Sequence, residues 1–209
     1  MKNVIFYKNL AKSITTVMKN HYDGHDHLHI ERVVGLSHQI LQHEFPSVNI
    51  MNAKFVEALA LCHDILDRKV NVMSETSLRD LLEVFNIEDS TRIVDTCKAF
   101  GYSYIPTTIL EKCVKDADML DAIGAIGVAR TFAYGGAHKI PYYDPNGESI
   151  TEYFSGHDSA SIINHFEEKL LKLGNRMYTS TGRLMAKPRI QFMGYFYDLF
   201  KSEVGESLC

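Results

Sequence analysis

Apolar residues recur every three to four positions along most of the chain, which is the spacing of one face of an α-helix. Val33, Leu36 and Ile40 follow His29 at this spacing and predict a first helix. The same pattern predicts further helices over residues 52–67, 77–85, 90–100, 108–122, 159–173 and 188–203. Strict alternation of apolar and polar residues, the pattern typical of strands, is nearly absent. We therefore predict an all-α protein.

Glycine and proline indicate where the predicted helices begin and end. Gly101 and Gly174 follow two of the apolar repeats and are expected to end them. Pro188 is expected in the first turn of the last helix, where a missing N–H costs nothing. Residues 134–151 are rich in Gly, Pro and Tyr and predict a long loop. Because such loops are often functional, we expect this one to lie near the site as a lid or pocket wall.

Length and composition indicate one globular domain, which we place at residues 1–209. The formal net charge of the 209 residues is only −4, so the chain offers no basic surface for duplex nucleic acid or an anionic membrane. No apolar run approaches the ~18 residues of a membrane span. The four cysteines have no paired spacing, which is typical of reduced thiols. We therefore expect a cytoplasmic protein.

Histidine is unusually concentrated near the N-terminus, since six of the ten histidines lie between residues 21 and 43. Asp26 is suited to cap a helix that begins near His27. His29 then lies in the first turn, where the helix dipole disfavours imidazolium and leaves a neutral, metal-competent ring. The alternative for His29 is a partly exposed histidine beside a helix cap.

A His-Asp doublet ends the apolar segment 58–62. Burying Asp64 costs several kcal/mol unless the carboxylate is paired or binds a cation. One alternative is that His63 and Asp64 are satisfied by neighbouring backbone. On a continuous helix His63 and Asp67 share a face and Asp64 is turned about 100° away. Asp67 would then be free to act on a water molecule.

Three carboxylates lie close together in the largely apolar segment 114–124. They are Asp116, Asp118 and Asp121, of which the last two are helical neighbours. The alternative is that they are surface carboxylates with Lys115 as their counter-ion. That alternative is reasonable for Asp116 and weaker for Asp118, which has apolar neighbours.

The order of these groups resembles the HD-domain phosphohydrolase superfamily, in which a His, a His-Asp doublet and a later Asp lie on a helical core. Three longer segments resemble bacterial HD hydrolases of the YedJ/YpgQ type, which are associated with nucleotide hydrolysis: ADMLDAIGAIGVARTFAYGG, INHFEEKLLKL and MYTSTGRLMAKPRIQFM. The likeness extends over residues 20–203. It implies a single HD-domain helical bundle with a metal-dependent hydrolase activity.

The resemblance also assigns roles to residues. It places the metal ligands at His29, His63, Asp64 and Asp118. It places an acid that assists the attacking water at Asp67, with the basic residues Lys69 and Arg32 stabilising the phosphate. Later basic positions that are candidates for phosphate contact are Arg130, Lys169, Arg183 and Arg189. Tyr134, at the start of the Tyr-rich loop, is a candidate to stack on a base.

Two imidazoles and two carboxylates suit one divalent ion, for which we expect Mn²⁺ or Mg²⁺, with Fe²⁺, Co²⁺ and Ni²⁺ as alternatives. Two-metal members of the superfamily use additional histidines after the doublet, but no histidine lies between His63 and His138 here, so the resemblance implies a single ion. The expected substrate is a nucleotide or another phosphoester. Pyrophosphate release competes with simple phosphatase action, and a non-catalytic module that senses a nucleotide or metal is the alternative function. Large apolar helical faces are compatible with a homodimer.

Overall fold

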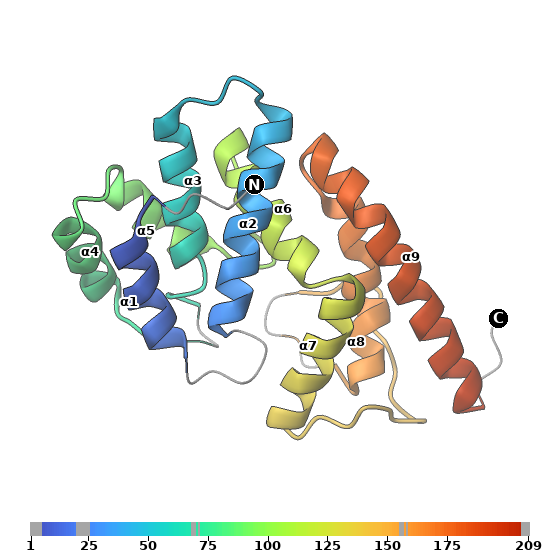
Figure 1. Ribbon diagram of the computed structural model, residues 1–209. Helices are drawn as coiled ribbons and strands as arrows, with labels where there is room; N and C mark the ends of the chain where they lie inside the picture. Colours follow the sequence, from blue (N-terminus) through green and yellow to red (C-terminus); the bar gives the residue numbers. More distant parts are fainter. Residues whose placement is uncertain are drawn as a thin grey trace.

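The computed structural model describes residues 6–19, 26–67, 70, 72–154, 157 and 159–205, and within these ranges all regular structure is helical. The helices are α1 (Lys8–Met18), α2 (His27–Glu44), α3 (Ile50–Cys62), α4 (Glu75–Val84), α5 (Ser90–Ala99), α6 (Ile109–Asp121), α7 (Gly124–Ala137), α8 (Ile162–Glu168), the 3₁₀ helix η1 (Leu170–Arg176) and α9 (Ser180–Glu203). The predicted all-α fold is confirmed (Figure 1). None of the described helices combines the length and apolar character needed to cross a bilayer.

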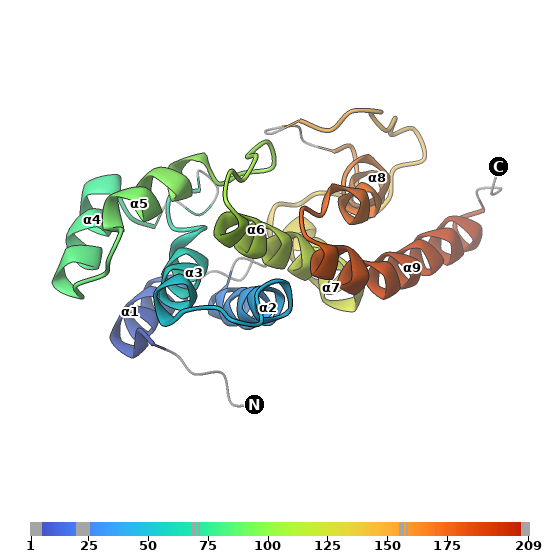
Figure 2. The same cartoon turned by 90° about the horizontal axis from the view of Figure 1, so that it is seen from above.

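Helix α2 lies at the centre of the molecule and packs most extensively against α6 and α3. Figures 1 and 2 show α1–α6 on one side of the molecule and α7–α9 on the other. The chain passes from the first group to the second at Ala122 and Ile123, between α6 and α7. Because α6 belongs to the central group and leads directly into α7, its side chains can contribute to a site between the two groups.

Helix α3 ends at Cys62, so the prediction of a continuous helix through Asp67 is wrong. Residues 63–66 form turns instead. The ring of His63 donates from Nδ1 to the carbonyl oxygen of Ala60, at 2.8 Å, and thereby satisfies an acceptor in the last helical turn. His63 and Asp67 therefore do not share a helical face.

Helix α9 begins at Ser180, and Pro188 lies inside it rather than in its first turn. The N-cap is Thr179, whose side chain accepts from the N–H of Gly182. Proline removes the hydrogen bond to the carbonyl four residues earlier, which belongs to Leu184. Leu184 is exposed, so water can solvate that carbonyl and the helix tolerates the proline.

Two helices were not predicted from the pattern, α1 and α7. Helix α7 continues to Ala137, so Tyr134 is helical and the long loop begins only after that helix. Gly135, which indicated a loop in the sequence, instead allows two helices to pack closely. A Cβ added at Gly135 would lie 2.1 Å from Cδ1 of Ile162, because α8 approaches α7 closely there. The predicted helix 159–173 is divided between α8 and η1.

Candidate active site

Two buried imidazoles are held in the same tautomer by hydrogen bonds on their Nδ1 side. Asp26 caps α2 by accepting from the N–H of His29, at 2.8 Å. The ring of His29 contacts Oδ2 of Asp121 through Nδ1, at 2.8 Å. His63 makes the equivalent contact to the backbone of Ala60. When Nδ1 carries the proton, Nε2 of each neutral ring presents a lone pair.

The two Nε2 atoms face the same pair of carboxylates. Oxygens of Asp64 lie 3.2 Å from Nε2 of His29 and 3.3 Å from Nε2 of His63. Oδ1 of Asp118 lies 3.8 Å from both nitrogens. Both histidines are fully buried, whereas a quarter of the Asp118 side chain is exposed. The structure therefore brings together all four residues to which the family resemblance assigned a ligand role.

The donor set fits a divalent cation. Nε2 of His63 is buried and makes no hydrogen bond within the described ranges. His29, His63 and Asp64 each offer one potential ligand atom, and these three atoms lie within 4.8 Å of one another. Imidazole nitrogen and carboxylate oxygen are together suited to Mn²⁺, Fe²⁺, Co²⁺ or Zn²⁺. A cation at this point would satisfy a buried acceptor that otherwise has no donor.

The electrostatics of the cluster also favour a cation. Burial and the charge of Arg130 lower the pKa of His29, but its contacts with Asp121 and Asp64 outweigh them and raise it overall. Burial tends to raise the pKa of Asp118, but Lys115 and the histidines outweigh burial and lower it. A raised histidine pKa beside anionic carboxylates indicates surplus negative charge in the cluster. A bound divalent ion would neutralise that charge.

Asp121 contacts the histidine cluster, although the sequence analysis assigned it no role. It accepts from Nε of Arg32 at 2.6 Å and from Nη1 of Arg130 at 3.0 Å, in addition to its contact with His29. Burial tends to raise the pKa of Asp121, but these partners outweigh it and keep the pKa well below its usual range. A carboxylate behind a ligating histidine fixes the tautomer and orientation of the ring. The three-residue spacing from Asp118 was the available signal.

A cavity of about 440 Å³ opens beside the cluster, lined by α6, α7, α8, η1 and the loops that lead to them. Asp64, Asp67 and Asp118 lie in its wall with Lys115. Three of the predicted substrate-binding residues also line it, namely Arg130, Tyr134 and Lys169. The cavity therefore places acidic and basic side chains in one enclosure. Lys69 lies outside the described residues.

Three predicted basic residues, Arg32, Arg183 and Arg189, do not line the cavity. Arg189 donates from Nη1 to the carbonyl oxygen of Leu120. Arg32 donates to Asp121 through two nitrogens, Nε and Nη2, and thereby supports this carboxylate. Arg183 donates to the carbonyl oxygen of Met177 at 2.8 Å, and its charge acts on Glu44 and Asp116. Arg183 lies in the first turn of α9, and its side chain binds the segment that leads into this helix.

Asp116 is also not a surface carboxylate. It is fully buried and accepts from the N–H groups of Tyr178 and Thr179, each at 2.8 Å, and from the hydroxyl of Thr179. These bonds join α6 to the start of α9. The carboxylate therefore has a structural role, and the suggestion that Lys115 is its counter-ion is wrong for Asp116.

Three residues of the predicted loop 134–151 line the cavity, namely Tyr134 and Gly135, which belong to helix α7, and Ile140. The segment that follows the predicted loop contributes Tyr153, His157 and Ser159. Glu168 of α8 is buried and accepts from the N–H of Ile150 at 3.1 Å and from the hydroxyl of Ser159. One carboxylate thus fixes two separate points of the loop against α8.

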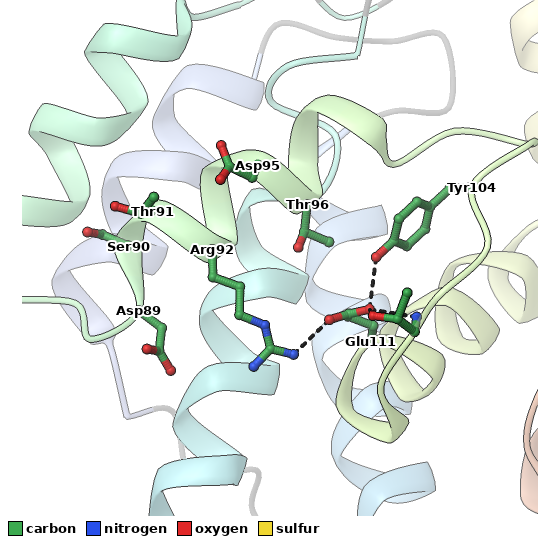
Figure 3. A pocket seen from close by; sticks show the side chains of 9 residues that line it. Asp89, Ser90, Thr91, Arg92, Asp95, Thr96, Tyr104 and Glu111 are labelled. Carbon is green, nitrogen blue, oxygen red and sulfur yellow. Dashed lines mark hydrogen bonds and ion pairs between the residues drawn. The ribbon is translucent and has the colours of Figure 1, made fainter.

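A larger and shallower hollow, of about 720 Å³, lies beside α5 and does not include the histidine cluster (Figure 3). At its edge Glu111 accepts from Arg92 at 2.7 Å and from the hydroxyl of Tyr104 at 2.9 Å. Glu111 also forms a capping box with Thr108 at the start of α6. Because its carboxylate is already satisfied by protein donors, we interpret this hollow as structural.

Comparisons with known proteins show the family of this chain. No protein-family model matches the chain. The crystal structure of Bacillus subtilis YpgQ in complex with ADP is 31% identical over 95% of each chain, with a TM-score of 0.76. An HD-superfamily hydrolase from Bacillus thuringiensis is 30% identical over 96% of this chain and 97% of that chain, with a TM-score of 0.71. A Lactobacillus plantarum protein is 28% identical over 97% of this chain and 98% of that chain, with a TM-score of 0.78. Because these relatives match it over almost its whole length, the chain belongs to the HD superfamily of hydrolases, in the group that includes YpgQ.

Proposed function

We propose that this chain is a metal-dependent nucleotide phosphohydrolase that cleaves a phosphoanhydride or phosphoester bond. The observation that carries the proposal is the convergence of two imidazole Nε2 atoms and two carboxylates beside a cavity with basic walls. Basic side chains suit the negative charge of a phosphate chain. The ADP bound to the relative YpgQ supports a nucleotide as the ligand. We expect the enzyme to act in the cytoplasm.

In this proposal His29, His63, Asp64 and Asp118 hold one divalent ion, with Mn²⁺ or Mg²⁺ preferred. The ion, when bound, lowers the pKa of a water molecule and neutralises charge on the phosphoryl oxygens. Asp121 keeps Nε2 of His29 available by holding its Nδ1–H. Arg32 donates to both oxygens of Asp121 and has no direct contact with substrate in this scheme.

Asp67 and the basic side chains of the cavity act on water and substrate. Asp67 lines the same cavity as Asp64 and would orient the attacking water and accept its proton. The water oxygen bonds to phosphorus while the bond from phosphorus to the oxygen of the leaving group breaks; the leaving group is a phosphate or pyrophosphate for an anhydride and an alcohol for an ester. Arg130 and Lys169 would bind the phosphate oxygens. Lys69, which follows Asp67 closely in the chain, is proposed to assist them.

The ³¹P NMR spectrum of nucleoside triphosphates incubated with the protein and Mn²⁺ tests the activity. Monophosphate with a pyrophosphate resonance would establish cleavage between the α and β phosphates. Orthophosphate alone would indicate phosphatase action, and monophosphates would then be tried. An unchanged spectrum would contradict the nucleotide hydrolase. His63→Ala is the control, because loss of one imidazole should abolish both metal uptake and turnover.

Replacing Asp67 with alanine separates water activation from metal binding. We expect Asp67→Ala to bind Mn²⁺ as the wild type does and to lose roughly 10² to 10⁴ in kcat, the usual contribution of a positioned acid or base. Calorimetric Mn²⁺ titration and steady-state kinetics measure the two effects. If Asp67→Ala instead loses the metal, Asp67 is a ligand.

A further inference from the structure

Lys115 of α6 has its ammonium buried in the wall of the cavity. Nζ lies 3.0 Å from the carbonyl oxygen of Gly101 and 3.5 Å from Oδ2 of Asp118. It also lies 4.7 Å from the centroid of the Phe100 ring. Only 4% of the residue is exposed. A charge removed from water to this extent is costly unless other groups compensate it, and here Asp118 is the anionic partner.

Asp118 is shared between this ammonium and the histidines. Its Oδ1 faces Nε2 of His29 and of His63, whereas its Oδ2 faces Lys115. The ring of Phe100 contacts His63 edge to face, with centroids 5.4 Å apart, and so connects the same two places. The carboxylate of Asp118 is therefore all that separates the positive charge of Lys115 from the point where the cation would bind.

This arrangement changes the charge of the loaded centre. Asp64 and Asp118 alone would neutralise a divalent ion with two neutral imidazoles. Because Lys115 already compensates part of the charge of Asp118, the same centre carries surplus positive charge once the ion is bound. An anionic phosphate in the cavity would remove that surplus.

We propose that Lys115 is a fixed internal counter-ion of the metal centre, which weakens binding of the ion alone and makes its binding depend on an anionic phosphate in the cavity. The inference rests on the proposed metal-dependent function and adds a charge that the four ligands do not supply. It predicts positive coupling between cation and phosphate. By thermodynamic linkage, each ligand then strengthens the other by the same factor.

The test is calorimetric titration of the metal-free protein with Mn²⁺. Lys115→Met keeps the apolar stem over Phe100 and removes the charge. Because a like charge close to the ion no longer repels it, we expect this variant to bind Mn²⁺ roughly tenfold more tightly than the wild type. Lys115→Arg retains the charge and should match the wild type. Lys112→Met removes a lysine charge elsewhere on α6 and should also match it.

A second titration, in the presence of ADP, measures the coupling. In the wild type ADP should tighten Mn²⁺ binding, and in Lys115→Met this tightening should be several-fold smaller. If Lys115→Met does not fold, Lys115→Gln provides the same neutral position with a polar end.

The outcomes distinguish the two proposals. Unchanged or weaker Mn²⁺ binding in Lys115→Met, with normal binding in the wild type, would overturn the role of Lys115 and leave the metal centre intact. Equal ADP coupling in the two proteins would also overturn it. Absence of Mn²⁺ binding in the wild type would overturn both proposals.

Discussion

The buried carboxylate of Asp121 determines the tautomer and orientation of the His29 ring through a hydrogen bond. It receives the Nδ1 side of His29 and the guanidinium groups of Arg32 and Arg130. In Asp121→Asn an amide NH₂ group facing Nδ1 would favour the other tautomer, in which Nε2 carries the proton and cannot bind a metal.

We expect Asp121→Asn to weaken Mn²⁺ binding by about 10- to 100-fold, the usual effect of removing such a supporting group. Mn²⁺ titration measures this effect. Asp95→Asn, an exposed acid on α5, is the control and should bind as the wild type does. Wild-type affinity in Asp121→Asn would show that the ring of His29 is oriented by other contacts.

At this scale the sequence predicted which four residues would meet but not what holds them. The order of His29, His63, Asp64 and Asp118 in the chain was enough to predict that they lie together, because the family that this order resembles places these residues in one site. Arg32 meets Asp121 because α2 packs against α6, which is distant in sequence. A pattern read along the chain contains no direct record of such a contact, so the sequence did not reveal this pairing.

At the scale of elements, the start of α6 matters because that helix carries Lys115, Asp118 and Asp121. Glu111 caps it and binds Arg92 and Tyr104. Burial tends to raise the pKa of Glu111, but Arg92 and the other donors outweigh burial and lower it from 4.5 to about 2.

A depressed carboxyl pKa stabilises the fold at pH values above the unfolded pKa, and this stability is lost as pH falls through the folded pKa. We expect Glu111→Gln to lower the free energy of unfolding by about 2 kcal/mol at pH 7. The difference from the wild type should shrink between pH 4.5 and pH 2. Urea unfolding at several pH values measures it. A difference that stays constant over this range would contradict an ionic role for Glu111.

The start of α9 provides a matched pair of glycine substitutions. A Cβ on Gly182 would lie 2.2 Å from Oδ2 of Asp116 and 2.9 Å from Oγ1 of Thr179, whereas a Cβ on Gly194 of the same helix meets nothing within 4 Å. We expect Gly182→Ala to destabilise the protein by about 2 kcal/mol, because buried atoms must move.

Gly194→Ala should instead stabilise it by about 0.5 to 1 kcal/mol through helix propensity. Urea unfolding of both variants checks the pair. Equal effects at the two positions would mean that the contact between α6 and α9 adapts freely.

The limits of element prediction have similar causes. Gly135 was assigned to a loop because a sequence pattern cannot distinguish a breaker from a close contact with Ile162. Pro188 was assigned to a helix start because its tolerance depends on an exposed helix face. Residues 63–66 leave the helix because the His63 ring binds the backbone, which apolar periodicity does not reveal.

At the scale of the whole molecule, the fold class was predictable because helical periodicity extends over most of the chain. The cavity was not, because α6 supplies Asp118 while α7 and the segment after α8 supply Arg130 and Lys169. These groups meet only when the helices on the two sides of the molecule pack (Figure 1). Of the loop predicted over residues 134–151, Tyr134 and Gly135 are helical, and Ile140 is the residue after α7 that lines the cavity.

The burial of the histidines has a kinetic consequence. His29 and His63 are fully buried, while Asp64 and Asp118 line the cavity, so an ion that binds in the proposed centre would reach the imidazoles by way of the cavity. A nucleotide in the cavity would then obstruct the exit of the ion. We expect EDTA to remove Mn²⁺ several-fold more slowly when ADP is present, as stopped-flow measurement of Mn²⁺ release would show. The same rate with and without ADP would indicate a separate route.

If ADP slows the release of the ion, the residence time of the ion follows the supply of nucleotide around the enzyme rather than the concentration of free metal alone.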